Sequence, residues 1–162
     1  ELSPSDDFEI DFEIAFSDQA IGDQQHSLNM KNGNFVRELS DCRTFCMFSD
    51  VEYMKTIGLA RGGSLANAVV IDDGKVLNPE GYRREDECVR HKMLDALGDL
   101  ALAGVPVIGR YHGVKAGHRM TNLLLRAVFE ASDSFEIVEV NLRQSAQLPG
   151  VGLSYKDLEL AV

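Results

Sequence analysis

Residues 8–16 alternate between apolar and polar side chains, which is the pattern of a β-strand with one face toward a core and the other toward water. Gly22-Asp23 offers a turn, so residues 25–30 are predicted to return as the second strand of a hairpin. Asn34 then stands where it can cap a short helix over residues 35–39. The start of the chain therefore predicts a hairpin followed by one helical turn.

The next stretch predicts a group of short elements bounded by cap and turn signals. These are an extended piece over residues 43–45, a helix over 51–57, and two strands over 67–71 and 75–77. Asp50 is expected to cap the helix and Gly58 to end it. Asp72-Asp73-Gly74 is a strong turn signal, so the two strands are predicted to pair as a hairpin.

The longest amphipathic pattern runs over residues 85–103 and predicts the main helix. Its first turn is acidic, which suits the positive end of the helix dipole, and Gly104 ends it. The later elements are a strand over 105–114, a helix from Gly117-His118 to about Ala131, and a strand over 135–140. Residues 141–162 show little periodicity and are expected to form a weakly ordered tail.

This order of elements predicts an α+β fold. We expect a two-layer sandwich in which a mixed sheet carries two main helices on one face. A length of 162 residues fits one domain, here assigned to residues 1–140. The start of the chain lacks a signal-peptide pattern. Because it also lacks an initiator Met, we expect the chain to be a piece of a longer protein.

Composition narrows the classes of function. A net charge of −10 argues against nucleic-acid binding through a general electrostatic field. No apolar run approaches the roughly 20 residues of a membrane helix, so no membrane span is predicted. The three cysteines have no CxxC spacing, which is typical of reduced thiols in a cytosolic protein.

The main helix also carries candidate chemistry. His91, Asp95 and Asp99 recur every four residues and so share one helix face. A metal ion would satisfy His91 and Asp95 together, although a surface pair or a buried histidine with its own partner has the same spacing. Asp99 is better suited to orient a second histidine. His118, at a predicted strand-to-helix junction, is the candidate for that histidine.

Other polar residues leave two interpretations open. Cys88 could be a third metal ligand or a small buried hydrophobic residue. Lys92 and Lys115 flank the two motifs and could form a local anion site or be ordinary solvated lysines. His26 and His112 lie in predicted strands with no identifiable partner and are interpreted as structural.

Several segments occur in the order and spacing of one enzyme family. They are Arg43-Thr44-Phe45, Gly62-Gly63-Ser64, Asn78-Pro79-Glu80-Gly81, Glu85-Asp86-Glu87, the run from Arg90 to Leu100, and Lys115-Ala116-Gly117-His118. Over residues 8–140 the chain resembles the C-terminal half of UDP-3-O-acyl-N-acetylglucosamine deacetylase (LpxC), the zinc enzyme of the committed step of lipid A synthesis. The run from Arg90 to Asp99 is the most specific part of the match.

The resemblance implies roles for the candidate catalytic residues. His91 and Asp95 would be zinc ligands, and His118, oriented by Asp99, would be the charged histidine beside the reacting amide. Thr44 would donate a hydrogen bond to the oxyanion. The third zinc ligand and a glutamate general base belong to a Val-Glu-His motif in the family's N-terminal domain, and no such motif occurs here. Because a catalytic zinc needs three protein ligands, the resemblance implies weak metal binding and no turnover by this chain alone.

The resemblance also implies substrate contacts. Lys92 and Lys115 would face the polar head or diphosphate of a UDP-sugar lipid, and Phe45 its nucleoside or sugar. Residues 51–77 would form the family's βαβ insert, which holds the 3-hydroxyacyl chain. Substrate-binding candidates in and beside this insert are Gly63, Leu65, Ala68 and Val70.

The function implied is zinc-dependent removal of the N-acetyl group from UDP-3-O-(3-hydroxyacyl)-N-acetylglucosamine, in the cytoplasm of a Gram-negative type bacterium. Partners would be the substrate and the missing N-terminal domain, whose absence would leave an apolar surface open to self-association. The alternative is a non-catalytic module that binds an acyl chain or a protein without metal.

Overall fold

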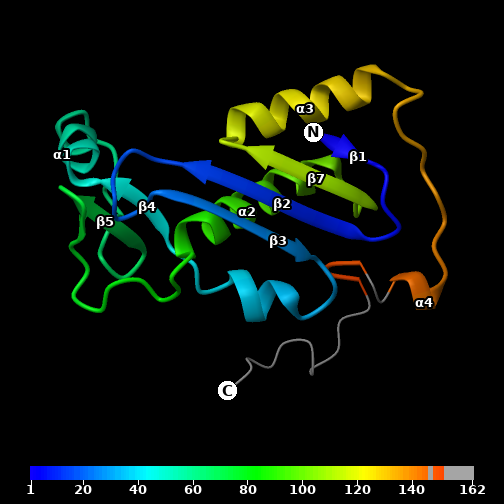
Figure 1. Cartoon of the computed structure of the whole chain (residues 1–162). Coiled ribbons are helices and arrows are strands. Elements are labelled where there is room, and N and C mark those ends of the chain that lie inside the picture. The colour runs from blue at the N-terminus through cyan, green and yellow to red at the C-terminus, as the bar shows by residue number, and fades with distance from the viewer. Residues whose placement is uncertain (146–147, 152–162) are drawn as a thin grey trace.

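A computed structural model describes residues 1–145 and 148–151. Its main sheet has the order β1-β7-β2-β3 and is built from β1 (Leu2–Ser3), β2 (Phe8–Ala15), β3 (Asp23–Asn29) and β7 (Gly109–Val114) (Figure 1). β2 pairs parallel with β7, whereas β1–β7 and β2–β3 are antiparallel pairs. The predicted mixed sheet and its N-terminal hairpin are therefore confirmed.

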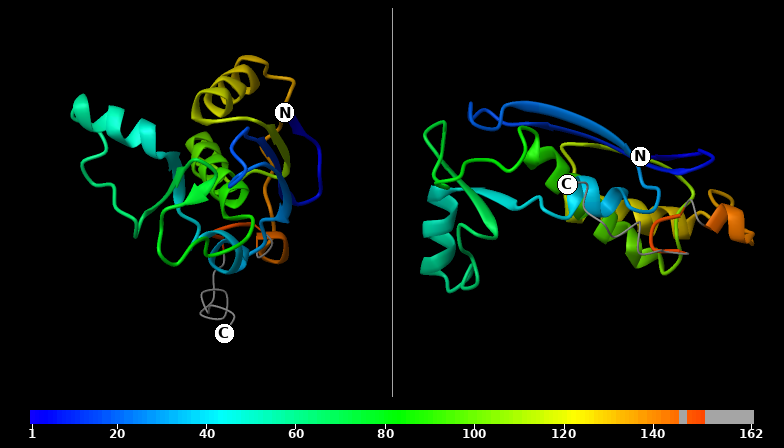
Figure 2. Two further views of the ribbon diagram at one scale, coloured as in Figure 1. Left: turned by 60° about the vertical axis from the view of Figure 1, so that its left-hand side comes forward. Right: turned by 90° about the horizontal axis from the view of Figure 1, so that it is seen from below.

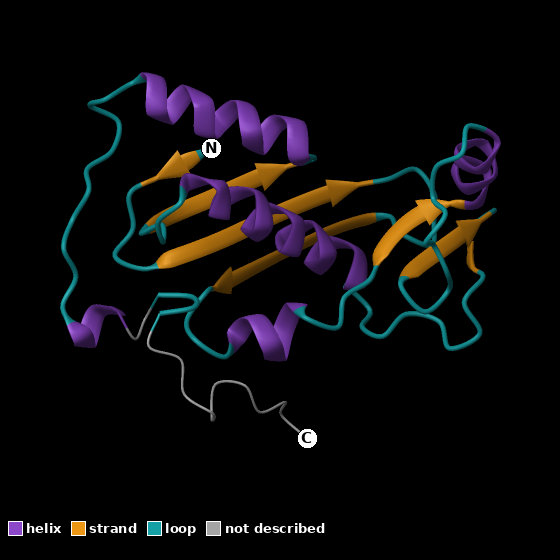
Figure 3. Cartoon of the chain, turned by 180° about the vertical axis from the view of Figure 1, so that it is seen from behind, coloured by secondary structure: helices purple, strands orange, loops and turns teal. Residues whose placement is uncertain are grey.

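Two helices form the second layer, α2 (Glu87–Leu100) and α3 (His118–Glu130). Figure 3 shows α2 across the middle of the sheet and α3 along its β1–β7 side, on the same face. The alternation of β2 places its apolar side chains inside, against the apolar stripe of α2. The core side chains that join these layers are Phe8, Ile10, Phe12, Ile14, Val89, Met93, Ala96, Leu100, Tyr111 and Leu125. The α+β two-layer fold is confirmed.

A second, smaller sheet extends from one end of the main sheet (Figure 2). It comprises β4 (Thr44–Met47), β5 (Ala68–Asp72) and β6 (Lys75–Val76), with α1 (Phe48–Thr56) between the first two. Since β4 and β5 are parallel, this is a βαβ unit. It starts at Thr44, earlier than the expected start of the insert. Asp73 and Gly74 both have positive φ, as the predicted tight turn between β5 and β6 requires.

Three local predictions are wrong. α1 begins at Phe48, so Asp50 lies within its first turn and is not its cap. The segment Phe35–Leu39 (η1) is a π-helix, and the Asn34 side chain bonds the carbonyl of Asn29 and the guanidinium of Arg37 without capping it. No strand forms over 135–140 in the described part of the chain.

Strand pairing explains the last error and the late start of β7. In the structure β1 is the strand that pairs with β7 on the side away from β2. Residues 135–140 pair with neither sheet, and Ile137 is 83% exposed. β7 begins at Gly109 and not at residue 105, and Pro106 lacks the N–H that a ladder needs.

After α3 the chain continues to a short helix, α4 (Leu142–Ser145), and Leu148 is buried. The expectation of weak order for the tail otherwise falls on residues 146–147 and 152–162, which lie outside the described residues. Within the described ranges, no helix combines the length and apolar character needed to cross a membrane.

Candidate metal and catalytic site

The fold brings the two halves of the candidate site together where α2 packs beside the first turn of α3. On α2, His91 Nε2 lies 3.2 Å from Asp95 Oδ1. On α3, His118 Nδ1 lies 2.9 Å from Asp99 Oδ1, and His118 Nε2 lies 3.9 Å from Asp95 Oδ2. Gly117 has an extended backbone and directly precedes α3. His118, the first residue of α3, contacts Asp99 of α2. Four residues spaced over 28 positions of sequence therefore form one polar group.

A backbone carbonyl fixes the orientation of the His91 ring. Its Nδ1 lies 3.2 Å from the carbonyl oxygen of Cys42, in the loop before β4. Since a carbonyl oxygen can only accept, Nδ1 must carry the proton in this contact. Nε2 is thereby directed at Asp95, which is the arrangement that metal-binding histidines use.

Asp95 is held as an anion. Lys92 Nζ lies 2.6 Å from Asp95 Oδ2, and His91 contacts the other carboxylate oxygen. Burial by itself would raise the pKa of Asp95, but the hydrogen bonds from His91 and Lys92 outweigh it and lower the pKa to about 2. The carboxylate is therefore ionised at neutral pH and available as a ligand.

An imidazole nitrogen and a carboxylate oxygen on one helix face are donors that suit zinc. In this structure Nε2 of His91 donates to Asp95, and a metal ion would take the place of that proton between the two groups. The imidazole nitrogen and the ionised carboxylate are therefore compatible with the ion. Over residues 1–145 and 148–151, however, no three such side chains are placed so that together they could hold a metal ion. Cys88 does not contribute, because it is buried in the core beside the Tyr82 hydroxyl, where burial raises its thiol pKa to about 11. A third donor would have to come from elsewhere.

Thr44 and Phe45 are the first two residues of β4. They directly follow the loop whose Cys42 carbonyl contacts His91. Thr44 is exposed, and the ring of Phe45 packs edge-to-face on Phe16 with centroids 5.4 Å apart. Phe16 is 42% exposed and lies just after β2, whereas the alternating pattern predicts it as the last residue of that strand. The local pattern around Phe16 does not indicate that its ring contacts Phe45. Together the two rings offer an apolar surface at the start of β4.

The two lysines differ in their surroundings. Lys92 is half-buried and bonded to Asp95, so it is part of the polar group itself. Lys115 is exposed in the turn between β7 and α3, with a φ of 52° that is unusual for a side chain of its kind. Its backbone N–H donates to the carbonyl of Glu13 at 2.8 Å, which extends the pairing of β7 with β2.

The insert candidates fall into two groups. Gly63 and Leu65 lie in the exposed loop before β5. Ala68 and Val70 lie in β5, opposite Thr44 and Cys46 of β4. Since Val69 and Ile71 belong to the main core, strand alternation turns Ala68 and Val70 to the opposite face of the small sheet.

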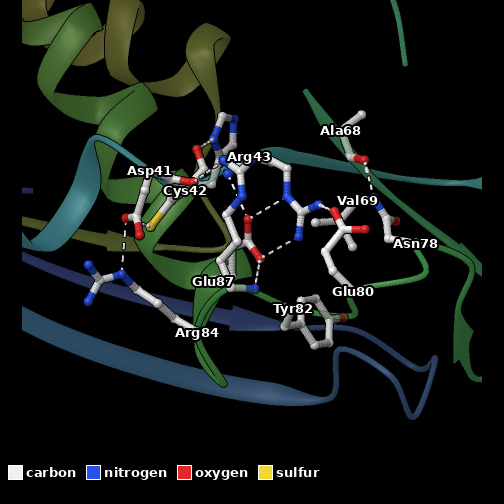
Figure 4. Close-up of polar contacts among 12 residues, drawn as sticks. Asp41, Cys42, Arg43, Ala68, Val69, Asn78, Glu80, Tyr82, Arg84 and Glu87 are labelled. Carbon is white, nitrogen blue, oxygen red and sulfur yellow. Dashed lines mark hydrogen bonds and ion pairs between the residues drawn. The ribbon is translucent and has the colours of Figure 1, made fainter. Parts of the chain in front are cut away.

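The largest feature that sequence reasoning missed is a buried ion pair behind the site. Arg43, directly before Thr44, contacts Glu87, which lies one turn before His91 on α2 (Figure 4). Their side chains are 2% and 0% exposed. The only sequence signal was that both residues lie inside matched motifs. Two smaller pairs were also missed, because His26 contacts Asp86 at 3.1 Å and His112 contacts Glu13 at 3.0 Å.

Comparison with known proteins identifies the family. The model of the family LpxC, UDP-3-O-acyl N-acetylglycosamine deacetylase, matches residues 1–130. The chain belongs to this family. It is 53% identical over 136 residues to the UDP-3-O-acyl-N-acetylglucosamine deacetylase of Phenylobacterium zucineum, covering 84% of this chain and 46% of that relative.

Other deacetylases of the family match the chain at lower identity. The Nitratiruptor protein is 44% identical over 140 residues, which are 86% of this chain and 47% of the relative. The Myxococcus xanthus protein is 44% identical over 157 residues, 97% of this chain and 49% of the relative. The chain thus spans about half the length of the curated relatives it matches.

Proposed function

We propose that this chain is the C-terminal half of a zinc-dependent deacetylase that hydrolyses the N-acetyl group of UDP-3-O-(3-hydroxyacyl)-N-acetylglucosamine, a cytoplasmic step of lipid A synthesis. The observation that carries the proposal is the group formed by His91, Asp95, Asp99 and His118, with His91 Nε2 and Asp95 directed at each other. The family membership of the chain supports the substrate.

His91 and Asp95 would hold the zinc ion, with a third ligand from the remainder of the protein. When bound, zinc supplies Lewis-acid polarisation of the acetamide carbonyl. Lys92 keeps Asp95 ionised and adds a positive charge beside it.

His118 and Thr44 would act on the substrate directly. His118, whose Nδ1 bonds Asp99, presents Nε2 on the side of Asp95, where it can give a proton to the leaving amine. The exposed Thr44 hydroxyl would donate to the oxyanion. Water adds to the amide carbon, the C–N bond breaks, and the products are acetate and the free amino sugar.

Substrate recognition would use the surfaces around this group. The Phe16–Phe45 pair offers rings to the sugar or nucleoside, and Lys115 offers a charge to the diphosphate. The face of the insert sheet that carries Ala68 and Val70 would lie along the acyl chain. Leu65 and Gly63 would border that passage from the loop.

The proposal is tested with the full-length protein that carries this chain. Wild-type protein is expected to contain one equivalent of zinc and to release acetate from the UDP-sugar substrate, and a chelator should abolish both. His91→Ala and Asp95→Asn are each expected to lose zinc and turnover. Substrate binding that is unchanged by these substitutions, without acetate release in the wild type, would instead indicate a non-catalytic binding module.

A further inference from the structure

One peptide group connects the buried ion pair to the candidate zinc ligand. The N–H of Arg43 donates to Glu87 Oε1 at 2.9 Å, and the carbonyl of Cys42 accepts from His91 Nδ1 at 3.2 Å. These are the two ends of the same peptide bond, which is planar and trans and therefore points them in opposite directions. Glu87 and His91 are four residues apart on α2, one helical turn, so both reach the bond from one face.

The carboxylate of Glu87 accepts several hydrogen bonds, which fix its position. Its Oε1 also accepts from Arg43 Nε at 2.9 Å, and its Oε2 accepts from Arg43 Nη2 at 3.1 Å and from the Arg83 N–H at 2.7 Å. Burial by itself would raise the pKa of Glu87, but these bonds outweigh it and lower the pKa. The carboxylate is thus a fixed anion at the rear of the site.

Arg43 holds the arrangement together from three sides. Besides Glu87 it donates to the Gly81 carbonyl at 2.8 Å and to the Leu65 carbonyl at 3.3 Å, and it pairs with Glu80. Figure 4 shows Arg43 between Glu87 on one side and Glu80 on the other. Movement of this guanidinium would therefore displace the loop that carries the Cys42 carbonyl.

The Cys42–Arg43 peptide group links the fixed Glu87 carboxylate to the imidazole of His91. An N–H bonded to a carboxylate leaves its carbonyl oxygen a stronger acceptor, because bonds in a chain polarise one another. A stronger and immobile acceptor keeps the proton on His91 Nδ1 and keeps the ring in one rotation. Partners of this kind set the tautomer of metal-binding histidines and influence metal affinity.

We propose that Glu87 is a positioning residue for the zinc site, acting on His91 through the Cys42–Arg43 peptide group, with Arg43 holding Glu87 in place. The zinc part of this inference rests on the proposed function, whereas the effect on His91 does not. Glu87 itself touches neither substrate nor metal.

The test uses the full-length protein with ¹⁵N-labelled histidine, in zinc-free and zinc-titrated form. In the zinc-free wild type, the Nδ1 proton of His91 should be visible by NMR and slow to exchange. Glu87→Gln removes the charge, and Glu87→Asp keeps the charge but withdraws it from the peptide N–H. Both are expected to lose the protected proton and to bind zinc roughly 10–100-fold more weakly.

Asp86→Asn is the matched control, because it changes the neighbouring carboxylate, which pairs with Arg90 and His26 away from this peptide. It should keep both the proton signal and the zinc affinity. A folded Glu87 variant that keeps both would overturn the inference, and if Glu87→Gln does not fold, Glu87→Asp decides. Should the wild type bind no zinc while the Glu87 variants still lose the proton signal, the zinc function fails and the positioning of His91 stands.

Discussion

His118 Nδ1 lies 2.9 Å from one carboxylate oxygen of Asp99 and 3.0 Å from the other. A carboxylate accepts, so Nδ1 is the protonated nitrogen and Nε2 is turned toward Asp95. The pair joins the first residue of α3 to α2 and sets the direction of the ring. Although the His118 side chain is 69% exposed, its orientation is therefore fixed by this carboxylate.

Asp99→Asn should lower deacetylation by the full-length protein by roughly 10²–10⁴-fold, because an amide can bind the wrong tautomer of His118 and no longer stabilises its charge. Acetate release and zinc content are the measurements, and zinc content is expected to stay unchanged. Glu130→Gln, at the exposed end of α3, serves as control and should leave turnover intact. Wild-type turnover in Asp99→Asn would refute the orienting role.

The local parts of the fold were accessible from the sequence because they depend on short-range patterns. The alternation of β2, the spacing along α2 and the glycines at 104 and 117 each report the geometry of one element. The i, i+4 spacing likewise placed His91, Asp95 and Asp99 on one face. The strand expected over 135–140 does not form. A strand needs the edge of another strand to pair with, and the residues of one segment do not show whether such an edge is available to it.

The buried Arg43–Glu87 ion pair could not be derived from the spacing of residues in the sequence. Arg43 and Glu87 are 44 residues apart, and nothing in either local pattern marks them as buried. Charged residues are rarely fully buried unless paired, so each alone is predicted to be exposed. The contact of Phe16 with Phe45 was hidden for the same reason, since it joins two sheets.

Two glycine substitutions should change stability in opposite directions. A Cβ atom on Gly113 would lie 2.7 Å from the Phe12 ring and 2.9 Å from the Tyr111 ring, both buried, so Gly113→Ala should cost about 1–3 kcal/mol. A Cβ on Gly98, inside α2, meets nothing within 4 Å, so Gly98→Ala should add about 0.5–1 kcal/mol. Urea unfolding measures both. A neutral or stabilising Gly113→Ala would contradict the packing between β2 and β7.

The Arg43–Glu87 pair should make stability depend on pH in the acid range. Since folding lowers the pKa of Glu87, its ionised form stabilises the native state at neutral pH, and this contribution is lost as the pH falls below its ordinary value of about 4.3. Glu87→Gln leaves Arg43 short of a partner and should cost about 3–5 kcal/mol at pH 7. The difference from wild type should shrink as the pH approaches that at which the wild-type carboxyl is protonated.

Urea unfolding at a series of pH values tests this dependence. Glu85→Gln, an exposed carboxylate two residues earlier, is the control and should stay within about 0.5 kcal/mol of wild type at pH 7. A Glu87→Gln deficit that is the same at every pH would mean that the charge of Glu87 does not contribute.

The outer face of α3 should make the isolated chain self-associate. Met120, Leu123 and Ala127 follow one another at three- and four-residue spacings and so share one side of α3. All three are exposed, Met120 by 59% and Leu123 by 48%. Figure 2 shows α3 at the periphery of the molecule. In the complete protein we expect the other half to cover this face, and without it a second copy is the available apolar partner. Each leucine-sized side chain that becomes buried contributes about 1.5–3 kcal/mol.

Sedimentation velocity over a wide concentration range measures this association. Leu123→Lys should shift the isolated chain toward monomer, because a charge at the centre of the face would have to be desolvated. Leu59→Lys, in the insert and 56% exposed, changes a comparable residue on a different surface and should leave the association as it is. A wild-type chain that stays monomeric at every concentration, or an equal effect of both substitutions, would show that the face of α3 is not the contact.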